Sequence, residues 1–357
     1  MRQVPTIVIL GVAIGAACSH VPPVAPPTLF PMATAWTTPL PAVVEGPLAA
    51  DATAVYVATR DGGLRSLALS TGAVRWEASG RPGTVAAGEG ALVLHEEGGT
   101  VWSIDPATGA TRWKVDSGVP GTLPAALYKD AVVVAGHGLS VLQAATGATR
   151  WSAPDVVATT LPLAWGPWLL TGEADGGLHC RDLATGAALW TYATPHPLLA
   201  PPVVDAEGRV LLGTTDRRFV SLDARGKGHE RWRWKVGADV QAPPALSGPR
   251  VLFTTHEDVL YALRRGDGHL AWRAALPSRP LSGPLLYGDG VLVATFGARP
   301  GETFLIGFDL VTGRRQGDLK APGEVRTPPV IAGDLVILGL RERAVAALRL
   351  GSVTPNP

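Results

Sequence analysis

A tryptophan recurs about every forty residues along the chain, and a Thr-Gly pair stands before it in several of the repeats. The phrase reads TGAVRW at 71–76, TGATRW at 108–113 and again at 146–151, and TGAALW at 185–190. The recurring residues are Trp36, Trp76, Trp113, Trp151, Trp190, Trp232 and Trp272. A period of about forty residues is typical of β-propeller blades and longer than most solenoid repeats.

Each repeat contains the same succession of short segments. A Pro-containing segment leads into an apolar run such as AVYVAT, a Gly-rich or charged turn follows, and an alternating run such as LRSLAL comes next. Thr-Gly or an equivalent turn then precedes the segment that opens with Trp. Four short runs joined by tight turns, without helical periodicity, predict a four-stranded antiparallel blade.

The two ends of the repeat region complement each other. Residues 323–350 supply three strands of a last repeat and lack the Trp strand, whereas residues 33–40 (ATAWTTPL) supply one Trp strand before the first full repeat. Pairing these ends predicts an all-β, eight-bladed propeller whose N-terminal strand completes the last blade and removes the exposed sheet edges. If the N-terminal strand does not dock, the alternative is seven blades.

The repeated residues have structural interpretations. The glycine of Thr-Gly can adopt a positive φ in a turn, and Asp105, Asp182 and Asp309, three residues before the Thr, can accept hydrogen bonds from turn N–H groups. We interpret the Trp rings as packing between neighbouring blades. A column of ligand-binding aromatic rings is the alternative, and it is disfavoured because there is one ring per blade on the outermost strand.

Two positions depart from the pattern of the repeat, and one cysteine conforms to it. Gln316 or Gly317 stands where the next Trp is expected, which predicts that this blade interface is the softest in the ring. Cys180 falls in a column of small residues and is interpreted as a core residue without a redox or metal role. Arg181 falls in a column otherwise held by apolar residues, so it either extends to solvent or faces a charge in the central channel.

The first residues have the features of an export signal. Arg2 precedes an apolar run that is too short to span a membrane, and small residues precede Cys18. This pattern resembles a bacterial lipoprotein signal, with Cys18 as the site of lipid attachment, although Gly15 stands where such signals have a branched apolar residue. An ordinary cleaved leader is the alternative. The expected divisions are a signal peptide at 1–17, the lipidated Cys and a Pro-rich tether at 18–33, the propeller at 34–350 and a C-terminal tail at 351–357.

Composition excludes several functions. The formal net charge is +1, which is too small for binding nucleic acid by phosphate neutralisation. The two cysteines lie far apart, and no His motif has metal-ligand spacing, so we expect neither a disulfide framework nor a metal site.

The segments SIDPATGATRW and CRDLATGAALW resemble the pyrroloquinoline-quinone-like propeller repeat, and the resemblance spans residues 34–350. Together with the signal and Cys18, the chain resembles the lipoprotein subunit of the outer-membrane β-barrel assembly machinery. The resemblance implies a non-catalytic scaffold that is anchored to the outer membrane by lipid alone, faces the periplasm, needs no cofactor and works as a monomer within a complex with an envelope protein partner. A secreted or cell-surface location is the alternative.

Two other functions remain open from the sequence. A quinone-dependent dehydrogenase shares the repeat, but the expected adjacent cysteines and a cluster of acids for calcium are missing. A sensor that binds a small ligand in its central channel is the other alternative. For the scaffold, the candidate partner-binding rim consists of the charged turns between second and third strands, with Arg217, Arg218, Arg341 and Arg343 as its basic members.

Overall fold

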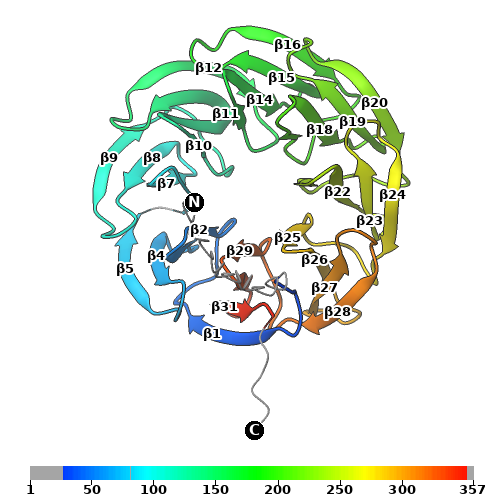
Figure 1. Ribbon diagram of the computed structural model, residues 1–357. Coiled ribbons are helices and arrows are strands. Elements are labelled where there is room, and N and C mark those ends of the chain that lie inside the picture. Colours follow the sequence, from blue (N-terminus) through cyan, green and yellow to red (C-terminus); the bar gives the residue numbers. More distant parts are fainter. Residues whose placement is uncertain (1–26, 81, 352–357) are drawn as a thin grey trace, which may run out of the picture.

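The computed structural model describes residues 27–80 and 82–351 and contains eight antiparallel sheets arranged around a central axis (Figure 1). Each sheet is one blade, and in the first seven blades the strands run outward from the axis in chain order. The prediction of an all-β, eight-bladed propeller is confirmed.

Seven blades follow one another along the chain. The first is β2 (Ala49–Ala50), β3 (Ala54–Ala58), β4 (Gly63–Ala68) and β5 (Val74–Ser79), and the second is β6 (Gly83–Gly88), β7 (Ala91–Glu96), β8 (Thr100–Ile104) and β9 (Thr111–Asp116). The third is β10 (Ala126–Tyr128), β11 (Ala131–Gln143) and β12 (Thr149–Val157), and the fourth is β13 (Leu163–Trp165), β14 (Trp168–Gly172), β15 (Gly177–Asp182) and β16 (Ala188–Ala193). The fifth is β17 (Val203–Val204), β18 (Arg209–Gly213), β19 (Arg218–Asp223) and β20 (His229–Lys235). The sixth is β21 (Ala245–Ser247), β22 (Arg250–Thr255), β23 (Val259–Arg264) and β24 (Leu270–Ala275), and the seventh is β25 (Leu285–Tyr287), β26 (Gly290–Phe296), β27 (Thr303–Asp309) and β28 (Arg315–Lys320).

The eighth blade joins the two ends of the chain. It consists of β29 (Val330–Ala332), β30 (Leu335–Leu340) and β31 (Ala344–Arg349), and its outermost strand is β1 (Ala33–Pro39). β1 pairs with β31 from Ala33↔Arg349 to Pro39↔Ala344, and the Leu40 N–H donates to the Arg343 carbonyl oxygen at 2.7 Å. The ring is therefore closed by backbone hydrogen bonds, as predicted, and Figure 1 shows β1 along the outside of β31.

The third blade has a shorter turn than its neighbours. β11 passes without interruption from the second strand position to the third, with the change of direction at Gly136–Gly138. His137 donates its N–H to the Pro120 carbonyl oxygen, as Arg60 does to Val43 in the first blade, and only Gly138 then separates His137 from the third strand position. A blade can thus lose its charged turn, with β11 supplying both the second and the third strand positions.

Each recurring Trp packs on the glycine turn of the next blade. The indole N–H donates to a backbone carbonyl oxygen of that blade: Trp36 to Leu69, Trp76 to Pro106, Trp113 to Ala144, Trp151 to Leu183, Trp190 to Ala224, Trp232 to Arg265 and Trp272 to Leu310, at 2.8–3.1 Å. The ring covers a glycine with positive φ in the same turn. Gly186, for example, has φ +76°, and an added Cβ would lie 2.8 Å from two ring atoms of Trp151. The Trp ring of the preceding blade therefore packs on the Thr-Gly turn.

The column of small residues lies opposite the Trp rings. Cys180 pairs with Trp190, Ser66 with Trp76 and Ala262 with Trp272 in the antiparallel register. Side chains of directly paired residues lie on the same face of a sheet. A small residue at this position leaves room for the ring against its own blade.

The hydrophobic core is divided among the interfaces between blades. The described residues form eight clusters, and each cluster combines two neighbouring blades. Tyr56 and Leu64 of the first blade, for example, pack with Leu92 and Leu94 of the second. Fully burying one such side chain contributes about 1.5–3 kcal/mol. Stability therefore comes from each blade's contact with its neighbours.

The turn aspartates act as local acceptors, as predicted. Asp105 accepts hydrogen bonds from the N–H groups of Ala107 and Thr108 at 2.9 and 3.0 Å, and Asp182 and Asp309 make the equivalent bonds. The Arg112 side chain and these N–H groups lower the pKa of Asp105 to about 2. The carboxylate thus holds the turn that carries the glycine.

The interface without a Trp contains a different ring. Gly317 occupies the Trp position and pairs with Gly307, and Phe30 lies against both glycines. Leu29, which is 1% exposed, joins the same cluster between the seventh and eighth blades. The residues just before β1 therefore supply a ring at this interface, a contact that the prediction of a soft interface did not include. Within the described residues, the packed part of the chain therefore includes residues before Ala33.

The contact between Gly186 and Trp151 can be tested against a glycine with the same conformation and no neighbour. Gly90 has φ +70° and nothing within 4 Å of an added Cβ. We expect Gly90→Ala to cost about 1 kcal/mol for its positive φ, and Gly186→Ala to cost about 1–3 kcal/mol more because the methyl group overlaps the ring. Urea unfolding measures both, and equal losses would contradict the proposed role of the ring.

Because Phe30 fills space between the seventh and eighth blades, truncating its side chain is predicted to destabilise the fold. We expect Phe30→Ala to lower the free energy of unfolding by on the order of 3 kcal/mol, because a ring between two blades is removed. Phe296→Ala is the matched control, since Phe296 is 44% exposed and its truncation should cost little. The account fails if both variants unfold at the same urea concentration.

Candidate protein-interaction face

The turns between second and third strands lie on the same face of the ring as the connections from blade to blade. We call this side the connector face. Each connection adds a short extended segment to the end of a second strand, as in the bridges Val44↔Thr59, Ala158↔Glu173, Pro280↔Thr295 and Val325↔Leu340. These backbone bonds fix the loops of the connector face to the rigid blades.

The four arginines expected at the rim all lie on the connector face, in two separate blades. Arg217 and Arg218 are at the start of β19 in the fifth blade, and Arg341 and Arg343 are between β30 and β31 in the eighth. Arg218 forms an ion pair with Asp216, and Arg341 pairs with Glu324 at 3.1 Å. Arg343 donates to the Pro41 carbonyl oxygen at 3.4 Å. The structure does not bring the four together into one patch.

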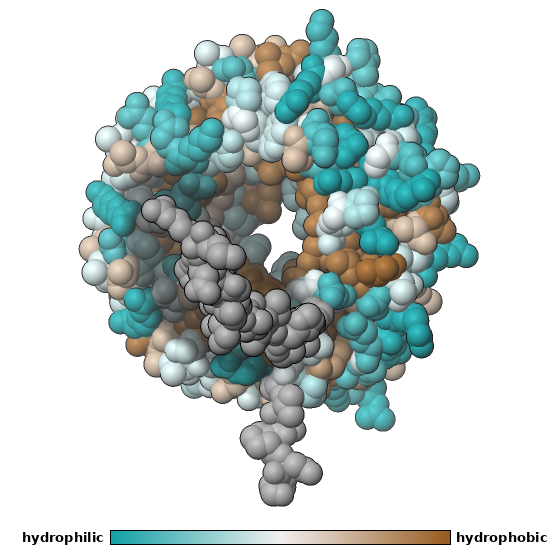
Figure 2. Space-filling model, viewed as in Figure 1, coloured by the Kyte–Doolittle hydropathy of each residue, from teal (hydrophilic) through white to brown (hydrophobic). Residues whose placement is uncertain are grey.

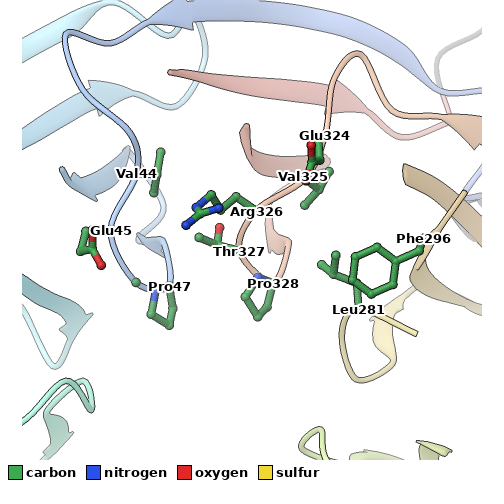
Figure 3. Close-up of a pocket in the computed structure, with 11 residues that line it drawn as sticks. Val44, Glu45, Pro47, Leu281, Phe296, Glu324, Val325, Arg326, Thr327 and Pro328 are labelled. Carbon is green, nitrogen blue, oxygen red and sulfur yellow. The ribbon is translucent and has the colours of Figure 1, made fainter. Parts of the chain in front are cut away.

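A groove lies on the connector face where the seventh, eighth and first blades meet (Figure 3). Its volume is about 480 Å³, and its walls are the connections Val44–Pro47 and Glu324–Pro328, with Leu281 and Phe296 at the seventh blade. Phe296 is 44% exposed and Leu281 is half-buried, so this end of the groove is apolar. Figure 2 shows the opening at the centre of the ring, with apolar residues around much of its described margin.

Arg326 is the free cation of this groove. Both neighbouring acids already have a partner, because Glu45 pairs with Arg60 at 2.9 Å and Glu324 pairs with Arg341. Among the described residues, the Arg326 side chain forms no hydrogen bond or ion pair, and it is exposed to solvent. Figure 3 shows it projecting between the two connections. The groove therefore combines an apolar end with an unneutralised positive charge.

Reasoning from the repeat missed Arg326, Leu281 and Phe296. A signal was available in the sequence, because aligning the eight repeats brings together the same connection position of each blade. In chain order the residues there are Glu45, Thr84, Thr122, Thr159, Leu199, Gln241, Leu281 and Arg326. Only Arg326 in this set is a cation.

Arg181 faces a charge within its own blade. Its guanidinium forms an ion pair with Glu173 and donates to the Thr171 hydroxyl at 2.9 Å, and both charged side chains are nearly buried. His179, two residues earlier, lies 2.9 Å from Asp175 and 3.1 Å from the Thr191 hydroxyl. The arginine is thereby accommodated among apolar neighbours by a local network.

Cys180 is buried and forms no disulfide. It belongs to the cluster between the fourth and fifth blades, and its burial raises the pKa of the thiol to about 12. Such a thiol is neither nucleophilic nor a metal ligand at neutral pH. Cys18 and residues 1–17 lie outside the described residues, so lipid attachment stays a prediction.

The environment of Cys180 predicts an unreactive thiol. In a Cys18→Ser variant at pH 8, the raised pKa of Cys180 keeps its thiol protonated, and the fold blocks access to it. We expect no reaction with a thiol reagent in the folded protein and complete reaction in 6 M guanidinium, about one thiol per chain. Rapid labelling of the folded protein would show that this blade interface opens.

The described part of the chain has no group of three or more His, Cys, Asp or Glu side chains placed to hold a metal ion. In residues 27–80 and 82–351 there is also no helix long and apolar enough to cross a membrane.

The fold and its repeat define the class, an eight-bladed propeller built from pyrroloquinoline-quinone-like repeats. Within this class, the family model described as outer membrane protein assembly factor BamB matches residues 33–154, 136–233 and 224–353. Because these matches cover most of the chain, the protein belongs to that family. No curated protein matches the chain.

Solved structures share the fold at low sequence identity. BamB from Moraxella catarrhalis is similar with a TM-score of 0.76 and 18% identity over 92% of this chain and 100% of that one. Sqt1 from Saccharomyces cerevisiae gives 0.74 with 10% identity over 89% and 99% of the two chains. The quinohemoprotein alcohol dehydrogenase from Comamonas testosteroni gives 0.67 with 13% identity over 91% and 77%. Similar propellers thus occur in proteins with different names and chemistry.

Proposed function

We propose that this protein is a scaffold in the assembly of outer-membrane β-barrel proteins. It would be held at the periplasmic side of the outer membrane by a lipid on Cys18 and would bind its partner through the connector face. The observation that carries the proposal is the match to the assembly-factor family over residues 33–353. The connector face, with exposed charged turns and a partly apolar groove, has the composition of a protein-binding surface.

A dehydrogenase is the second candidate, because quinone-dependent dehydrogenases share the fold. Such an enzyme needs a quinone site with carboxylate ligands for a hard cation. The cavity at the sixth, seventh and eighth blades is lined instead by prolines and small residues such as Pro243, Gly283 and Pro328. The residues present therefore favour the scaffold.

Co-purification tests the scaffold directly. An affinity-tagged full chain should be expressed in its native host at its native level and extracted with mild detergent. We expect the core barrel protein of the assembly machinery to co-purify in near-stoichiometric amount. Recovery of the tagged chain alone after extraction and after chemical cross-linking would refute the proposal.

The anchor is tested in the same cells by a Cys18→Ala variant. If the lipid holds the protein at the membrane, the variant should move to the soluble periplasmic fraction and lose most of its co-purifying partner. A Cys180→Ala variant is the matched control and should stay in the membrane fraction. Retention of Cys18→Ala at the membrane would refute lipid anchoring and leave the interaction itself open to the first test.

A further inference from the structure

The groove between the seventh, eighth and first blades has walls that are bonded to the rigid blades. The Arg326 N–H donates to Gly339 at 2.8 Å and the Glu324 carbonyl oxygen accepts from Arg341 at 2.9 Å, so these groups are used within the eighth blade. Thr327, the next residue, is buried at a bend, and Pro328 and Pro329 after it have no N–H. Recognition in this groove therefore depends on side chains.

The walls of the groove continue toward the central channel. A second cavity, of about 290 Å³, shares Leu281 and Pro328 with the first and is lined further by Pro243, Gly283 and Pro284. A trough without bulky side chains leaves room for an extended segment, whose side chains are then recognised by the residues that line the groove.

The side-chain sites differ in character along the groove. Phe296 and Leu281 provide an apolar surface at the seventh blade, and Arg326 provides a free positive charge at the eighth. The acids beside Arg326 are engaged by Arg60 and Arg341, so the local field favours an incoming carboxylate over an incoming ammonium group.

We propose that this groove binds an extended segment of a partner protein that places an acidic side chain on Arg326 and an apolar side chain on Phe296 and Leu281. Both side chains lie on one face of the segment, so they are separated by one or three residues. The inference deepens the proposed scaffold function and rests on it for biological meaning, whereas the binding chemistry belongs to the groove itself.

Synthetic peptides test the groove without any cellular partner. The probes are capped, fluorescein-labelled nonapeptides of Thr and Ser that carry one Phe and one Glu, separated by one or three residues. Matched peptides carry Gln or Lys in place of Glu. Fluorescence anisotropy at low salt should show at least tenfold tighter binding of a Glu peptide than of its Gln counterpart to the wild-type chain.

Charge reversal in the protein supplies the decisive comparison. Arg326→Glu should lose the preference for Glu peptides and bind the Lys peptide at least tenfold more tightly than the Glu peptide. Phe296→Ser should weaken binding of every Phe peptide while keeping the Glu preference. Arg314→Glu reverses an exposed cation in a turn between third and fourth strands, on the opposite face, and should behave as wild type.

Several results would overturn the proposal. These are equal binding of Glu and Gln peptides, an unchanged preference in Arg326→Glu, the absence of binding by any peptide, or Arg326-dependent binding of phosphatidylglycerol vesicles in place of peptides. Failure of co-purification together with successful peptide reversal would refute the scaffold function and leave the groove assignment standing. The two failures are therefore distinguishable.

Discussion

The contact between an indole ring and the glycine of the next blade is the interaction on which the whole ring depends. A single blade leaves both of its faces uncovered, and each buried cluster is made by two neighbouring blades. The indole N–H bond to the next blade's turn and the ring's position over a glycine join neighbouring sheets in the same way at successive interfaces. Repeated around the axis, these contacts bring the eighth blade back to the first.

The eighth blade completes this arrangement with residues from the start of the chain. Trp36, carried by β1, continues the series by bonding to Leu69 of the first blade. The segment before β1 contributes Leu29 and Phe30 to the preceding interface, where the Trp position is a glycine. The N-terminal stretch therefore acts at two interfaces at once. A lipid on Cys18 would be joined to the ring through this same stretch. Cys18 lies nine residues before Pro27 in the sequence.

The blade count, the ring closure and the role of the turn aspartates could be predicted from the sequence. The repeats show which residues occupy the same place in each blade, and the two chain ends each supply part of one repeat. Phe30 could not be predicted, since it lies outside the repeat and fills a space created by Gly307 and Gly317 together. The rim illustrates the same limit. Arg218 and Arg341 look free in the sequence but are paired in space, whereas Arg326 is unpaired because its neighbouring acids bind other arginines. Which charge is left without a partner depends on contacts between blades, and these carry no signature in a single repeat.

The central claim is that the ring is closed by β1 and holds together as one unit. Amide hydrogen exchange measured by mass spectrometry tests it most directly, by comparing peptides from Ala33–Pro39 with peptides from β20 and β24, the outermost strands of internal blades. If β1 is integral to the ring, its hydrogen-bonded amides should exchange as slowly as those of β20 and β24, and all should become labile together as urea is raised. Fast exchange confined to β1, with the other outer strands still protected, would contradict the account.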